Sequence, residues 1–148
     1  MRGAGITMNP LFGNPFKRYR IEKKVKQLQA DEQWQGLADF VMGLPERQRD
    51  NYLLVDVADA YNHLGRYRES YDLIRTMRGG SSDWMWLYCV GVSHYYLAEQ
   101  AKGNPKKERR LRQRAKEMFE QSMLHRADEA YAAKCQDYLR RIDNLQSE

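Results

Sequence analysis

Comparable residues recur 33 positions apart in this 148-residue chain. Trp34 and Tyr67 have this separation, and so do Ala58 and Gly91. Apolar residues between these positions, as in the stretch 51–64, follow the three-to-four-residue spacing of a helix that buries one face. A constant offset between helical segments is typical of helix pairs stacked side by side. The chain is therefore expected to be all-α, with about three antiparallel helix pairs.

Turn-forming residues separate the expected helices. Gly79 and Gly80 follow an apolar helical stretch, and either glycine can provide a left-handed C-cap. Ser82 or Asp83 then offers a side-chain oxygen that can cap the next helix. These signals predict a helix boundary just before the aromatic stretch 83–97.

The stretch 53–74 places large, small and aromatic residues at fixed positions along two helices, namely Leu54, Val57, Ala58, Tyr61, Leu64, Gly65, Tyr67, Ser70 and Ile74. This pattern resembles the tetratricopeptide repeat. A following unit matches at Leu87, Val90, Gly91, His94, Leu97, Ala115, Phe119 and Ser122, and an earlier unit at Ile21, Val25, Leu28, Trp34, Leu37 and Val41. The resemblance implies a stack in which the first helix of each pair lines a concave groove.

The resemblance implies one helical domain over residues 17–148, preceded by a flexible segment at 1–16. The expected parts are repeats at 17–45, 51–78 and 83–125, followed by a polar capping helix at 128–145. The third repeat contains a basic insertion at 99–110, which either lengthens both of its helices or forms a projecting loop. The glycine, asparagine and proline at 103–105 favour a loop at its centre.

Membrane insertion and secretion are not expected. The aromatic stretch 83–97 is shorter than the roughly 18 to 20 apolar residues that span a bilayer. The N-terminal segment lacks the apolar region of a signal peptide. Cys89 and Cys135 lie far apart and have no Cys or His at metal-ligand spacing, so they are expected to be buried thiols. We therefore expect a cytoplasmic protein with no membrane partner.

Positive charge is concentrated in two segments. Residues 17–26 contain six basic residues and one acidic residue, and residues 102–116 contain eight and one, although the net charge of the chain is only +5. The rest of the chain is therefore acidic. A nucleic-acid-binding domain usually presents one basic face on a basic domain, so this segregation disfavours a nucleic-acid partner. The candidate basic patch, which also fits a plain solvated face, comprises Lys106, Lys107, Arg109, Arg110, Arg112 and Arg114.

The groove implied by the repeat resemblance provides the candidate partner-binding residues. Side chains of the first helices that do not face the core are expected to line it, namely Tyr52, Val55, Asp59, Asn62, His63, Met85, Tyr88, Val92, Tyr95 and Tyr96. Tyrosine and methionine suit such a wall because each offers a large and adaptable contact surface. An aromatic stripe also fits core packing, with the capping helix over the tyrosines. The carboxylate clamp of chaperone-binding members is not reproduced at Glu22, Lys26, Val55 and Asp59.

Catalytic residues, a cofactor and a metal site are not expected. His63, His94 and His125 are about thirty residues apart and occupy different places in their helices, so their spacing predicts no metal triad. His94 occupies a core-like position and is expected to be a buried histidine. The sequence also lacks a glycine-rich phosphate loop and a nucleophile motif.

These observations favour a non-enzymatic module that binds another protein. The stretch 44–67 also resembles small bacterial tetratricopeptide proteins that accompany polymorphic toxins, which implies an immunity protein that neutralises a toxin domain. One alternative is a secretion or assembly chaperone that holds a peptide of a secreted substrate in the groove. Another is a nucleic-acid-associated factor that uses the basic segment 106–116. The sequence does not indicate the oligomeric state.

Overall fold

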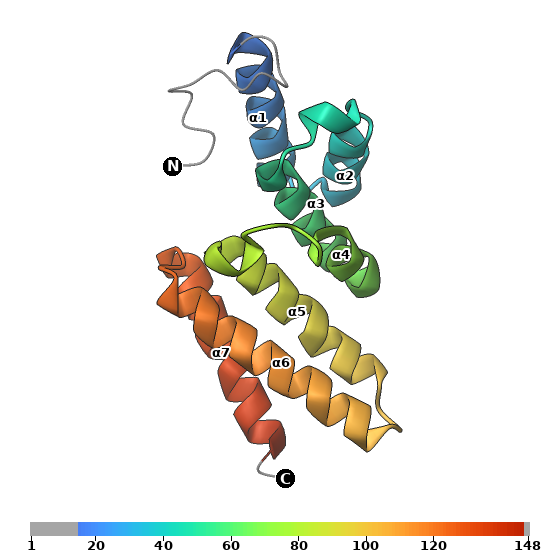
Figure 1. Cartoon of the computed structure of the whole chain (residues 1–148), viewed down its shortest axis with the longest axis vertical. Helices are drawn as coiled ribbons and strands as arrows, with labels where there is room; N and C mark the ends of the chain where they lie inside the picture. The colour runs from blue at the N-terminus through green and yellow to red at the C-terminus, as the bar shows by residue number, and fades with distance from the viewer. Residues whose placement is uncertain (1–14, 147–148) are drawn as a thin grey trace. The chain divides into compact units, whose positions relative to one another are not determined.

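The computed structural model describes residues 15–146, which form seven α-helices joined by short connections (Figure 1). The elements are α1 (Pro15–Ala30), α2 (Trp34–Met42), the short 3-10 helix η1 (Glu46–Gln48), α3 (Asn51–His63), α4 (Tyr67–Ile74), the 3-10 helix η2 (Gly80–Ser82), α5 (Trp84–Gln100), α6 (Pro105–Leu124) and α7 (Glu129–Gln146). No strand occurs among these residues, so the expected all-α fold class is confirmed.

The contacts between residues group the chain into two compact units, and the boundary between the units lies between Gly65 and Arg66. Unit 1 contains α1, α2 and α3, and unit 2 contains α4 to α7. The sequence predicted one domain over 17–148, whereas this boundary falls inside the second predicted repeat. Gly65 has a φ of +77°, a left-handed conformation that favours glycine. Residues 1–14 of the predicted flexible segment lie outside the described residues.

In unit 1, α2 packs against both α1 and α3. Leu37 and Val41 on its apolar face are fully buried, as expected for a short amphipathic helix. Trp34, at the start of α2, stacks on His63 at the end of α3 with ring centroids 3.9 Å apart. Burial of Leu37 and Val41 and the stacking of Trp34 on His63 hold α2 in place within unit 1.

In unit 2, α5 is the central helix and packs against α4 and α6. Twelve of its 17 residues are buried. Asp83 caps its first turn by accepting a hydrogen bond from the Met85 backbone N–H, which confirms the capping role expected for this position. Gly79 adopts the left-handed conformation expected of a glycine in this turn.

The basic insertion lengthens both helices of the third predicted repeat. α5 extends to Gln100 and α6 starts at Pro105, so only the turn at 101–104 interrupts them. Asn104 caps α6 by accepting a hydrogen bond from the Lys107 backbone N–H, and proline is well suited to a first helical position. Of the two alternatives, the insertion lengthens both helices around a turn near its expected centre, and the basic side chains from Lys106 onward belong to a helix.

α7 packs against α6 at the C-terminal end of unit 2 (Figure 1). Its bounds agree closely with those of the predicted capping helix at 128–145. None of the helices within residues 15–146 combines the length and the apolar character needed to cross a bilayer.

Candidate functional site

The expected groove wall on α5 is closed. Tyr88, Val92 and Tyr95 are only 7%, 6% and 9% exposed. Tyr131 of α7 packs edge-on against Tyr88, and Tyr138 of α7 packs in the same way against Tyr95, with ring centroids 5.0 Å apart in both pairs. The expectation that these side chains line an open groove is therefore wrong for unit 2, because α7 covers the two tyrosines.

Tyr138 lies at the centre of this aromatic cluster. Its ring stacks on Phe119 of α6 with centroids 4.8 Å apart, and its hydroxyl lies 3.3 Å from the hydroxyl of Tyr96. Burial raises the pKa of Tyr138, and the hydrogen bond with Tyr96 raises it further. Such contacts between rings and hydroxyls are typical of a packed core whose polar tips are satisfied.

The sequence carried a signal for this covering face. Tyr131, Cys135, Tyr138 and Ile142 recur at the spacing of one helical face, and Cys135 and Ile142 are fully buried. The prediction of a polar capping helix came from the repeat resemblance. The apolar stripe of α7 was long enough to cover a neighbouring helix.

The remaining candidate positions divide between buried and exposed sites. Val55, Asp59 and Asn62 of α3 are buried, whereas Tyr52 is 40% exposed and His63 is exposed beside Trp34. Met85 and Tyr96 are half-buried. The ten candidates therefore do not form one accessible surface.

An open cleft lies elsewhere, between α1 and α3 of unit 1. Its volume is about 250 Å³, and it is lined by Arg18, Glu22, Val25, Lys26, Gln29, Leu53 and Asp56. Val25 and Leu53 are the apolar residues of this lining, and almost all of their surface is already buried within unit 1. The other five side chains are charged or polar. The cleft can therefore hold a chain segment with charged or polar groups.

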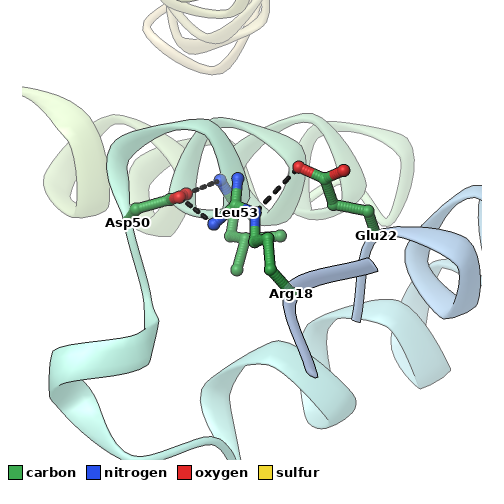
Figure 2. A network of polar contacts seen from close by, with 4 residues as sticks. All are labelled: Arg18, Glu22, Asp50 and Leu53. Carbon is green, nitrogen blue, oxygen red and sulfur yellow. Dashed lines mark hydrogen bonds and ion pairs between the residues drawn. The ribbon is translucent and has the colours of Figure 1, made fainter. Parts of the chain in front are cut away.

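Arg18 connects the two helices at one end of the cleft (Figure 2). Its guanidinium bonds Glu22 on α1, with Nε 2.8 Å from Oε1, and also pairs with Asp50 just before α3. Asp50 in turn accepts a hydrogen bond from the Leu53 backbone N–H at 3.0 Å and so caps α3. The Arg18 side chain is only 12% exposed, so the pair is partly shielded from solvent.

Gln29 and Asp56 connect the helices further along the cleft. The Gln29 amide donates a hydrogen bond to Oδ1 of Asp56 at 3.3 Å. Asp56 is only 3% exposed, whereas Lys26 between the two connections is exposed. Within the described residues, no carboxylate forms an ion pair with Lys26. A second hollow of about 330 Å³ on the outer side of α1 also includes Lys26, together with Tyr19, Glu22, Lys23, Gln27 and Ala30.

Only part of this cleft was predictable from the sequence. Glu22 and Lys26 were compared with the carboxylate clamp of the resembled family, but Arg18, Gln29 and Asp56 were not singled out. The apolar face of α1 indicated Val25 as a core residue. The charged residues that flank this apolar face of α1 were the sequence signal for the cleft.

The expected burial of His94 and of the two cysteines is confirmed. His94 is 6% exposed, and its Nδ1 donates a hydrogen bond to the Val90 carbonyl at 2.9 Å. Burial lowers the pKa of His94, and the positive charges of Arg114 and Arg68 lower it further, against the hydrogen bond to Val90, which raises it. Cys89 and Cys135 are buried thiols, and burial raises the pKa of Cys135.

The histidine, cysteine and acidic side chains of residues 15–146 form no group of three that could hold a metal ion. The chain matches no family model, no curated protein and no solved structure. The resemblance to tetratricopeptide repeats therefore stays a prediction.

Proposed function

We propose that the chain is a non-enzymatic module that binds another protein through the cleft between α1 and α3. One observation carries the proposal: α1 and α3 leave an open hollow whose lining includes the polar groups of both helices and the exposed cation of Lys26. A partner segment that carries a carboxylate can enter this hollow and pair with Lys26. Such complementarity favours one partner over others.

The specific partner that we propose is a toxin domain in the cytoplasm. The motivation is the resemblance of the stretch 44–67 to immunity proteins of the tetratricopeptide type. Neutralisation needs only a complementary surface that blocks the toxin, and no reaction chemistry. The two buried thiols, Cys89 and Cys135, suit a reducing compartment.

The chaperone alternative relied on the tyrosine-lined face of α5. Because α7 covers Tyr88 and Tyr95 in unit 2, that face offers no open cradle for a peptide. We therefore favour recognition through unit 1 over the holding of a substrate along α5.

The cleft is tested by reversing the charge of Lys26. Tagged wild-type protein and the Lys26→Glu variant are used as baits in lysate of the source cell, and captured proteins are quantified by mass spectrometry. The matched control is Lys24→Glu, which makes the same change at an exposed position of α1 outside both hollows. We expect Lys26→Glu to weaken binding of the specific partner at least about tenfold, and Lys24→Glu to change it little.

Co-expression then tests the identity of the partner. The captured protein is produced alone and together with the wild-type chain or each variant. A toxin should inhibit growth alone, and wild type and Lys24→Glu should restore growth where Lys26→Glu does not. A harmless partner would overturn the toxin proposal and leave the cleft in place. Equal protection by both variants would instead show that the cleft is not the binding site.

A further inference from the structure

The strongest charged surface that the proposed function does not use lies on α6 of unit 2. Five exposed cations occupy its first three turns, and we call them the basic face: Lys106, Lys107, Arg109, Arg110 and Arg114. Residues 106, 109, 110, 113 and 114 follow the spacing of one helical side, and position 113 is a glutamine. Leu111 and Ala115 on the opposite side are buried.

The basic face keeps its positive charge. Glu108 is the one acidic residue between positions 105 and 116, and it forms an ion pair with Arg112, which lies outside the basic face. Within the described chain, no carboxylate is within ion-pair distance of the five cations. Their charges are therefore available to a partner.

The position of these cations works against the stability of the helix. The N-terminal end of a helix carries a partial positive charge, so acidic residues are favoured there and basic ones are not. Lys106 and Lys107 occupy the first turn of α6, and Arg109 and Arg110 follow directly. The same side of the helix becomes acidic further along, at Glu117 and Glu120. The positive charge of this side is therefore confined to the N-terminal part of α6, where it adds to the partial positive charge of the helix N-terminus.

A protein or a membrane fits this surface poorly. Protein interfaces are centred on apolar and aromatic residues that exclude water, and the basic face has none: its members are lysine, arginine and one intervening glutamine. A helix that lies on a membrane inserts an apolar face. The apolar face of α6, which includes Leu111, Ala115 and Phe119, is already buried in unit 2.

A phosphate backbone fits it well. Binding to a duplex backbone requires cations and no apolar centre, and arginine pairs with phosphate in a bidentate manner. From Lys106 to Arg114 the helix rises about 12 Å, a length over which a duplex carries about seven phosphate charges. The absence of an aromatic residue from the basic face disfavours single strands, which stack their bases on such side chains.

We propose that the basic face of α6 binds the phosphate backbone of double-stranded nucleic acid without sequence preference. The test measures fluorescence anisotropy of labelled DNA and RNA duplexes of about 20 base pairs, together with one DNA strand of the same length, over a range of salt concentrations. We expect the duplexes to bind more tightly than the single strand. With all five cations in contact with phosphates, the slope of log K against log salt should be about −4.5 for the duplexes.

The decisive variant is the triple change Arg109→Glu, Arg110→Glu and Arg114→Glu. We expect duplex affinity to fall at least about thirtyfold and the salt slope to become shallower by about 3. The matched control is Arg20→Glu, Lys23→Glu and Lys24→Glu on α1, which changes the net charge equally at exposed positions. Circular dichroism and urea unfolding verify folding, and the corresponding glutamine triple replaces any variant that fails this check.

Three results would overturn the proposal. The α1 control could weaken duplex binding as much as the α6 triple does, which would mean that overall charge alone is responsible. A polyglutamate peptide could compete with the duplex at equal charge concentration, which would identify the basic face as a site for an acidic protein segment. The α6 triple could also retain wild-type affinity and salt slope. Preference for the DNA or the RNA duplex would identify the natural ligand within the proposed class.

Discussion

Gly91 of α5 faces the ring of Phe119 of α6 so closely that a Cβ atom at position 91 would lie 2.8 Å from Cε1 of Phe119. Real Cβ contacts are essentially never that short. The ring cannot move away easily, because Phe119 is fully buried and stacks on Tyr138. Absence of a side chain at position 91 is therefore what allows α5 and α6 to pack in this way.

Gly91→Ala should destabilise the protein. Alanine is intrinsically better than glycine in a helix by up to about 1 kcal/mol, but the clash with Phe119 should exceed this gain and leave a net loss of about 1–2 kcal/mol in the free energy of unfolding. Urea unfolding followed by circular dichroism measures the change.

Gly36→Ala provides the control for this substitution. A Cβ atom at Gly36 of α2 would make an ordinary contact with Leu28 at 3.5 Å. The variant should therefore be unchanged in stability or slightly more stable, by up to about 1 kcal/mol. If Gly91→Ala were stabilised to the same extent, the close packing of α5 on α6 would be wrong.

Tyr138 should make the protein sensitive to alkaline pH. Its pKa in the folded state is raised above the ordinary value of about 10, mainly by burial. The unfolded chain therefore loses this proton at a lower pH than the folded chain does, so stability falls as pH rises past about 10. We expect a decrease of roughly 1 kcal/mol per pH unit between about pH 10 and 11.5, measured by urea unfolding.

Tyr138→Phe should reduce this alkaline decrease, and Tyr67, whose pKa is also raised by burial, should account for part of what remains. The variant should cost up to about 1 kcal/mol near neutral pH for the lost contact with the Tyr96 hydroxyl. The exposed Tyr52 provides the comparison. Tyr52→Phe should retain the decrease. A Tyr138→Phe protein with the full alkaline decrease would show that the decrease has another source.

His94 should produce the opposite dependence at acidic pH. Its folded-state pKa is lowered by burial, so the unfolded chain takes up a proton near the ordinary value of about 6.5 while the folded chain remains neutral. The contribution of His94 to the free energy of unfolding is therefore fully present above that pH and is lost as the pH falls below it. We expect the free energy of unfolding to decrease by roughly 1 kcal/mol between about pH 7.5 and 5.5.

Two variants separate His94 from other titrating groups. His94→Gln should flatten the stability profile over this pH range, whatever its effect on stability at pH 7.5. The exposed His125 lies outside the core, so His125→Gln should leave the profile unchanged. Identical slopes in wild type and His94→Gln would refute the assignment.

The helices and their local signals were predictable because they depend on neighbouring residues. Asp83 is followed by an apolar helical stretch, and a capping side chain acts within its own turn. Gly91 could be identified as a position of close approach from its place in the repeat pattern. The start of α6 at Pro105 could not be decided from the sequence, because proline occurs in loops and also at the first position of helices.

The accessible surfaces were less predictable, because they depend on which distant segment covers each helix. Tyr88 is covered by Tyr131, which lies 43 residues later in the chain. The cleft in unit 1 depends on Arg18 reaching Asp50 across 32 residues. Periodicity indicates which face of a helix is buried, but it does not identify the segment that buries it.

Asp50 combines two contacts that substitutions can separate. It caps α3 through the Leu53 backbone N–H and pairs with Arg18 across the cleft (Figure 2). Asp50→Asn retains a capping oxygen and removes the charge, so it should cost about 0.5–1.5 kcal/mol in a partly shielded pair. Asp50→Ala removes both contacts and should cost about 1 kcal/mol more.

Salt provides an independent measure of the Arg18–Asp50 pair. In urea unfolding at low and high ionic strength, the stability difference between wild type and Asp50→Asn should shrink as salt increases, because screening weakens a pair that solvent reaches in part. The further difference between Asp50→Asn and Asp50→Ala should not change with salt, because it reports a hydrogen bond within one helix turn. If Asp50→Asn and Asp50→Ala were equally stable, Asp50 would not cap α3. If Asp50→Asn were as stable as wild type at low salt, the Arg18–Asp50 ion pair would contribute nothing to the connection of α1 with α3.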